Sequence, residues 1–168
     1  MENLLIKKLD IAADMLEKSG TADFAERVNY INKVIDLIFD ANLLKERHPE
    51  WYNEPVWNNF VKNTEGIMRK NLDKVALHAM KQLSGFEIQW IADGWQSWQQ
   101  LCILLSEMEF LKETYKSYIS EEDFEMIEMD SVVDFSKSVN GGGYLPEEYI
   151  PEAMPVSHWW WWYPANEE

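Results

Sequence analysis

Acidic side chains are the most concentrated chemically active groups of this chain. Between positions 121 and 134 they are Glu121, Glu122, Asp123, Glu125, Glu128, Asp130 and Asp134. If this stretch is an α-helix, Glu121, Glu125 and Glu128 share a face, because residues three and four apart are helical neighbours. Such a face could bind a divalent cation, dock on a basic protein or copy the phosphates of DNA. A solvated surface is the alternative, since exposed runs of charge commonly have no other role.

One short pattern within this cluster is typical of metal binding. The sequence Glu121-Glu122-x-x-Glu125 resembles the magnesium-binding helix of the all-α nucleotide pyrophosphatases. The resemblance covers five residues and implies an α-helical, Mg²⁺-dependent hydrolase. That family also carries Glu-x-x-Asp on a second helix further along, and no Asp follows Asp134. We therefore predict a non-enzymatic protein without a metal, a cofactor or catalytic residues, and keep the hydrolase as an alternative.

The other residue types that perform catalysis are not spaced for it. His48, His78 and His158 do not occur in His-x-x-x-His or Glu-x-x-His spacing, so a zinc or di-iron site has no local support. Gly-x-Ser-x-Gly and Walker A patterns are also absent from the sequence. Cys102, the single cysteine, lies in an apolar helical pattern, which indicates a reduced, buried thiol in a cytoplasmic protein.

Four consecutive tryptophans follow His158 and precede Tyr163. Each Trp buries roughly 150–250 Å², whereas the largest apolar patch on a soluble monomer is about 300–600 Å². The run must therefore dock on its own domain, on a second copy or on a partner. In an extended chain, alternate side chains face opposite ways. One pair (159 and 161, or 160 and 162) could then pack on the domain while the other faces outward, or all four could pack within the chain; the sequence leaves both open.

The charge of the chain is unevenly distributed. Residues 1–118 hold 14 Lys and Arg against 18 acids, a net charge of −4, whereas residues 119–168 hold Lys137 against 12 acids, a net charge of −11. This field repels nucleic acid and anionic membranes and attracts basic proteins. No apolar run reaches the roughly 20 residues of a membrane span, and the N-terminus does not read as a secretory leader.

Hydrophobic spacing predicts helices over most of the first two-thirds of the chain. Thr21 is expected to cap the second helix, which His48-Pro49 should end. Residues 56–83 form either one helix bent near Gly66 or two that meet near Asn71. Ser84 and Glu87 match a capping box, so the next helix is predicted from about 86 to 118. Its apolar stripe is the longest, which makes it the expected central helix.

The last third is predicted to be less regular. A short acidic helix is expected at 121–129, and residues 130–140 fit either a strand or a short helix. Gly141-Gly142-Gly143 is a flexible break. The prolines that follow favour extended chain. We therefore predict an all-α fold, a bundle of four to five helices over residues 1–140, with a glycine-hinged, extended aromatic arm at 141–168 that packs on the same domain.

Small, acidic, cytoplasmic proteins without catalytic motifs resemble bacterial immunity proteins in character. That resemblance implies a basic protein partner, such as a toxin domain, that is neutralised by binding.

 We expect electrostatic steering by the acids, followed by locking through aromatic anchors. A phage or plasmid DNA-mimic inhibitor of a host defence protein is the alternative within binding proteins. The expected partner-binding residues are the seven acids of 121–134 together with Glu147, Glu148, Glu152, His158, Trp159, Trp160, Trp161, Trp162 and Tyr163.

Overall fold

A computed structural model describes residues 2–93, 95–127 and 145–162. For residues 85–93, 95–97 and 125–127 only the backbone is described. The fold is all-α, as predicted, and the described residues contain no strand. The α-helices of the described residues are α1 (Leu4–Ser19), α2 (Phe24–Arg47), α3 (Glu54–Lys70), α4 (Leu72–Asp93) and α5 (Trp95–Tyr115). Short 3₁₀ helices within the described residues are η1 (Pro49–Trp51), η2 (Glu122–Ile127), η3 (Glu147–Tyr149) and η4 (Trp159–Trp162).

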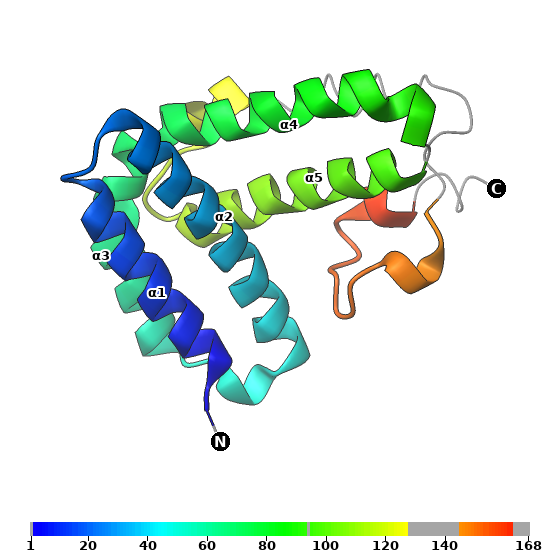
Figure 1. The fold of residues 1–168 in the computed structure, drawn as a ribbon. Helices are drawn as coiled ribbons and strands as arrows, with labels where there is room; N and C mark the ends of the chain where they lie inside the picture. Colours follow the sequence, from blue (N-terminus) through cyan, green and yellow to red (C-terminus); the bar gives the residue numbers. More distant parts are fainter. Residues whose placement is uncertain (1, 94, 128–144, 163–168) are drawn as a thin grey trace.

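The helices form two groups that share one core. α1 packs against both α2 and α3, whereas α4 and α5 lie side by side and run across the direction of α1 (Figure 1). α2 joins the groups because it contacts α1, α4 and α5. The C-terminal arm folds back onto the bundle and contacts α5 through η4. α5 is therefore covered by helices and by the arm, in agreement with its predicted central position.

Side-chain caps fix where three of the helices begin. Asn3, Asp23 and Asn53 each accept a hydrogen bond from the backbone N–H three residues further on, at 3.1, 2.9 and 3.1 Å respectively. Such caps satisfy backbone donors that have no partner inside the helix. The expected cap at Thr21 is wrong, since Asp23 takes that role in α2. The predicted end of α2 at His48-Pro49 is confirmed.

The segment from 56 to 118 is divided differently from the prediction. Two helices meet at Asn71, which settles the choice left open for residues 56–83. α4 then continues through Ser84 to Asp93, so the capping box predicted there is wrong. Ser84 donates its hydroxyl hydrogen to the carbonyl of Met80 at 3.0 Å, as a serine inside a helix does. The predicted helix at 86–118 is therefore shared between α4 and α5.

The apolar stripe predicted for α5 is confirmed. From Trp98 onward its predicted members are buried, and the side chains of the two earlier ones, Ile91 and Trp95, lie outside the description; the buried members are Trp98, Cys102, Leu105, Met108, Leu111 and Tyr115. Two polar contacts join this helix to its neighbours. The hydroxyls of Tyr115 and Thr64 lie 2.7 Å apart, and Asn42 Nδ2 donates to Thr114 Oγ1 at 3.1 Å. Satisfied buried polar pairs of this kind fix the relative position of helices more narrowly than apolar contact alone.

The expectations for residues 130–140 and for the glycine hinge at 141–143 lie outside the described residues. The short acidic helix is present as η2, but it is a 3₁₀ helix. None of the helices that the structure describes is long and apolar enough to cross a membrane.

Candidate functional site

The described part of the arm, residues 145–162, is folded against the bundle. Leu145 and Met154 are buried and anchor it. Between these anchors and η4 the chain forms turns, one of which holds Ala153 in the left-handed region at φ 67°. The prediction of an extended aromatic segment is wrong at the tryptophans, because residues 159–162 form the 3₁₀ helix η4.

The 3₁₀ geometry decides which tryptophans are buried. Trp160 and Trp161 are 8% and 1% exposed, whereas Trp159 is 39% exposed. Trp162 is partly buried. A 3₁₀ helix has three residues per turn, so Trp159 and Trp162 share one side and the two residues between them point elsewhere. The alternating pairs expected for an extended chain are therefore replaced by an adjacent buried pair.

Ser106 of α5 is the centre of the contact between arm and bundle. Its hydroxyl oxygen accepts hydrogen bonds from the indole Nε1 of Trp161 at 2.8 Å and of Trp160 at 3.1 Å. A serine hydroxyl offers two acceptor positions and one hydrogen to donate. With both acceptor positions filled, the hydrogen is directed at Nδ1 of His158, 2.8 Å away. The sulfur of Met154 is a weaker acceptor at 3.7 Å.

The backbone of the arm is held as well as its side chains. The carbonyl oxygen of Trp160 accepts from Trp98 Nε1 at 3.2 Å and from Cys102 Sγ at 3.4 Å. In return, Trp160 Nε1 also donates to the carbonyl of Cys102 at 3.2 Å. These bonds are buried, where an unpaired polar group would cost about 1–3 kcal/mol, so they fix the position of the arm backbone on α5. The prediction that Cys102 is buried and free is confirmed.

His158 is fully buried, at 0% exposure, between two aromatic rings. Its ring centroid lies 4.6 Å from that of Phe110 and 4.8 Å from that of Trp160. Because Nδ1 accepts from Ser106, we assign its hydrogen to Nε2, which has no hydrogen-bond partner among the described residues. Burial lowers the pKa of His158 to about 4. The imidazole is therefore neutral near pH 7.

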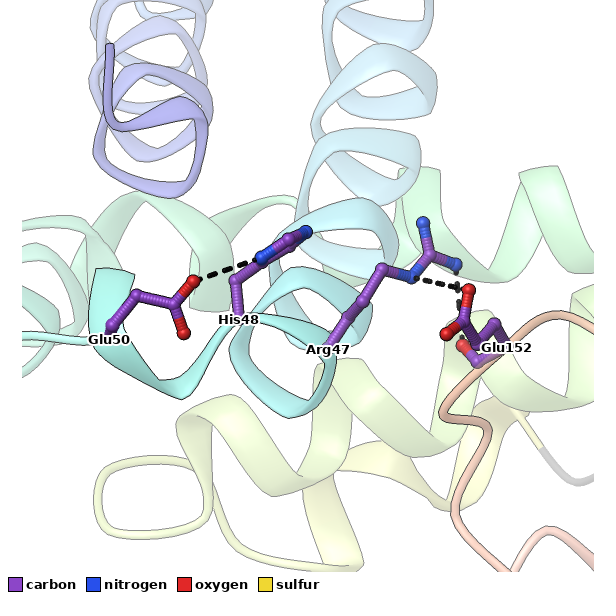
Figure 2. Close-up of polar contacts among 4 residues, drawn as sticks. All are labelled: Arg47, His48, Glu50 and Glu152. Atoms are coloured by element: carbon purple, nitrogen blue, oxygen red, sulfur yellow. Dashed lines mark hydrogen bonds and ion pairs between the residues drawn. The ribbon is translucent and has the colours of Figure 1, made fainter. Parts of the chain in front are cut away.

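A second tether joins the arm to the end of α2 (Figure 2). Arg47 Nη2 donates to the carbonyl oxygen of Glu152 at 3.3 Å, and Arg47 Nε lies 3.8 Å from the Glu152 carboxylate. His48 turns to the other side, where its Nδ1 lies 3.1 Å from Glu50 Oε1. The Glu152 side chain is 81% exposed, so this ion pair is weak compared with the buried contacts at Ser106.

Beyond the buried contacts at Ser106, the arm presents acidic and apolar side chains to solvent. The exposed acidic and large apolar residues, which we call the arm surface, are Glu147, Glu148, Tyr149, Glu152, Val156 and Trp159. Val156 is 85% exposed, the highest value among the exposed large hydrophobic residues. Four of these six residues are among those expected to bind a partner. By contrast, His158, Trp160 and Trp161 are buried within the chain, so they support the arm and do not contribute to its outer surface.

The acidic cluster of 121–134 is described only at its start. Glu121, Glu122 and Asp123 are exposed at η2. The side chain of Glu125 and residues Glu128, Asp130, Asp134 and Tyr163 lie outside what the structure describes. Since η2 is a 3₁₀ helix, residues 121 and 125 do not share the α-helical face proposed for them, and residue 128 lies outside the description. No group of three His, Cys, Asp or Glu side chains suited to a metal ion occurs within the described residues.

Sequence reasoning missed Ser106, the residue that receives both indoles. Its signal was a small polar side chain inside the apolar stripe of α5, where a hydroxyl needs a partner from another segment. Glu107, the next residue, was also missed; it is buried at 5% exposure.

Comparison with known proteins does not add a family. No protein-family model, curated protein or solved structure matches this chain. The support for a function therefore comes from the chemistry of its own surface.

Proposed function

We propose that the protein is a non-enzymatic binding protein that docks on a basic protein through the arm surface. The observation that supports this most directly is the position of the arm. Its buried half is locked onto Ser106, while its outer half carries the carboxylates Glu147, Glu148 and Glu152 beside exposed Val156 and Trp159. Aromatic anchors with a charged surround are characteristic of protein interfaces.

Charge supports a basic partner in particular. The arm lies in the part of the chain, residues 119–168, that carries a net charge of −11. Acidic surfaces of this kind accelerate encounter with positively charged proteins and discriminate against acidic ones. The apolar and aromatic share of the arm surface favours a protein interface over a copy of DNA phosphates, which would need carboxylates without anchors.

The class of partner that fits best is a toxin domain, as for the bacterial immunity proteins that the chain resembles in character. A nuclease is one such partner, since its phosphate-binding surface is basic. Blocking that surface with carboxylates would inhibit the toxin without any chemistry on the part of this protein. The proposal therefore requires a stable complex and an intact arm, and it requires no turnover.

The test compares two sets of charge-neutralising substitutions. The first is Glu147→Gln, Glu148→Gln and Glu152→Gln on the arm surface. The matched control is Asp10→Asn, Asp14→Asn and Glu17→Gln, which removes the same charge from the exposed face of α1. Proteins retained by the immobilised wild-type chain from its source lysate would be identified by mass spectrometry. The association rate of the retained basic protein would then be measured at increasing salt.

We expect the arm variant to associate at least tenfold more slowly than the control variant, and the wild-type rate to fall as salt rises beyond about 0.1 M, where the screening length is about 10 Å. A retained protein that binds both variants equally, or a rate that is independent of salt, would contradict the proposal.

A further inference from the structure

A polar cavity of about 350 Å³ lies between α2, α4 and α5. On α5 its lining residues are Gln100, Ile103, Leu104 and Glu107, which share one face because they are spaced three and four apart. This face differs from the one that carries Ser106 and the arm. Small-molecule sites commonly have volumes of about 300–1,000 Å³, so the cavity is large enough for a compact ligand.

The cavity has an exposed rim and a buried floor. Asp36, Gln82 and Gln100 are exposed at the rim. On the floor, His78 and Glu107 are 7% and 5% exposed. The imidazole Nε2 of His78 lies 3.5 Å from Glu107 Oε1. A ligand could therefore enter past polar side chains and reach a carboxyl group that is shielded from water.

Two buried polar atoms beside this cavity have no hydrogen-bond partner within the described chain, Asn32 Oδ1 and His78 Nε2. Both residues line the cavity. Buried polar atoms are nearly always paired in proteins, and leaving one unpaired costs about 1–3 kcal/mol. Asn32 Oδ1 can accept hydrogen bonds but cannot donate them, and the same is true of an ionised carboxylate. Asn32 Oδ1 is therefore an unused acceptor that a ligand with N–H donors could satisfy.

The charge of the lining also suits a cationic ligand. Two carboxyl groups, Asp36 and Glu107, line the cavity, and no Lys or Arg occurs among its lining residues. The pKa of Glu107 is raised to about 7, chiefly by burial, with a further increase from Asp36 and an opposing effect of His78. A carboxyl group without a cation in a buried site is ionised more readily when a cation is supplied.

We propose that this cavity binds an organic cation that carries N–H donors, a guanidinium or primary ammonium group. Its N–H groups would donate to Asn32 Oδ1 and to the carboxylates of Asp36 and Glu107. The absence of a metal-type grouping of ligands in the described chain favours an organic cation over a metal ion. The proposal is independent of the arm surface, because it uses a different face of α5.

The direct test is a titration of the full-length protein with methylguanidinium chloride, followed by the ¹H NMR signals of His78. Tetramethylammonium chloride is the control, since it has the same charge but no N–H donor. We expect a saturable shift with methylguanidinium and at least tenfold weaker binding of tetramethylammonium. Equal responses to the two cations, or no response to either, would overturn the proposal.

Substitutions locate the effect. We expect Glu107→Gln and Asp36→Asn each to weaken methylguanidinium binding at least tenfold. Asp36 is exposed, so its variant keeps the test valid if Glu107→Gln does not fold. The matched control is Asp40→Asn, one turn further along α2, where the carboxylate pairs with Lys8 at 3.1 Å and does not line the cavity. Unchanged binding in Asp36→Asn, or an equal loss in Asp40→Asn, would refute the site.

Two further measurements define the ligand. Binding should release a proton near pH 7, because a cation lowers the pKa of Glu107. Calorimetry in two buffers of different ionisation enthalpy detects this proton release. If no proton is released, Glu107 is not a ligand.

The tripeptide Gly-Arg-Gly distinguishes the source of the cation. Binding as tight as that of methylguanidinium would assign the cavity to an arginine side chain of a protein, and tenfold weaker binding to a free small molecule.

Discussion

The buried histidine of the arm should make the stability of the protein depend on pH with a defined sign. His158 has an ordinary pKa of 6.5 when unfolded and a pKa of about 4 in the fold. Protonation therefore favours the unfolded chain. The contribution of neutral His158 to stability is fully present above about pH 6.5 and is lost as the pH falls towards 4. Replacing His158 by Asn keeps an acceptor for Ser106 and removes the titrating group.

The magnitude follows from proton linkage. Each pH unit between the two pKa values is equivalent to about 1.4 kcal/mol of unfolding free energy. From pH 6.5 down to about pH 5 this amounts to about 2 kcal/mol for His158. Glu107 acts in the opposite direction, because its pKa is raised from 4.5 to about 7. Its contribution is fully present below pH 4.5 and is lost as the pH rises through 7, by about 2 kcal/mol between pH 5 and 7.5.

The assay is urea unfolding, followed by tryptophan fluorescence, at half-unit steps from about pH 5 to 7.5. We expect the destabilisation caused by His158→Asn to be about 2 kcal/mol larger at pH 7.5 than at pH 5. The destabilisation caused by Glu107→Gln should change by a similar amount with the opposite sign. The loss of packing in either variant shifts its whole curve and leaves this difference unchanged. A constant destabilisation by His158→Asn at all pH values would refute the assignment of a neutral, buried imidazole.

Three other predictions concern the arm. Ser106→Ala should lower the unfolding free energy by about 2–4 kcal/mol, since it leaves Trp161 Nε1 and His158 Nδ1 without partners. The control, Ser84→Ala at an exposed site, should change the unfolding free energy by less than about 0.5 kcal/mol. Ala153→Gly should raise it by about 0.5–1 kcal/mol, because φ is 67° there. Truncation before Leu145 should lower it by several kcal/mol, since each tryptophan buries roughly 150–250 Å². An unchanged melting temperature in the first or third variant would contradict the packing at Ser106.

The helical bundle could be predicted because its signals are local. The stripe on α5 follows helical spacing, and His48-Pro49 marks the end of α2 through backbone chemistry. The boundary between α4 and α5 could not be placed this way. Ser84 and Glu87 satisfy the pattern of a capping box, but the helix continues through them and the Ser84 hydroxyl bonds to the carbonyl of Met80 inside the helix.

The form of the tryptophan run could not be predicted for a different reason. Its burial followed from area alone, but the choice between a strand and a 3₁₀ helix depends on the surface that receives it. Ser106 offers one oxygen to two indoles, so Trp160 and Trp161 must approach it from adjacent positions. A strand would point adjacent side chains in opposite directions and could not make both bonds. The receiving residue lies more than fifty positions away, where no local pattern connects it to the arm.

Burial of the two central tryptophans is compatible with a binding role for the rest of the arm. A segment that is ordered only on binding must lose conformational freedom at that moment, which reduces affinity. The contacts at Ser106 and Cys102 hold the described arm in place in the free protein. Immobilising a side chain at an interface costs about 0.5–1.5 kcal/mol, and part of that cost is already met in a folded arm. The buried tryptophans would thus raise affinity through the fold, while Trp159 and Val156 supply the contacts.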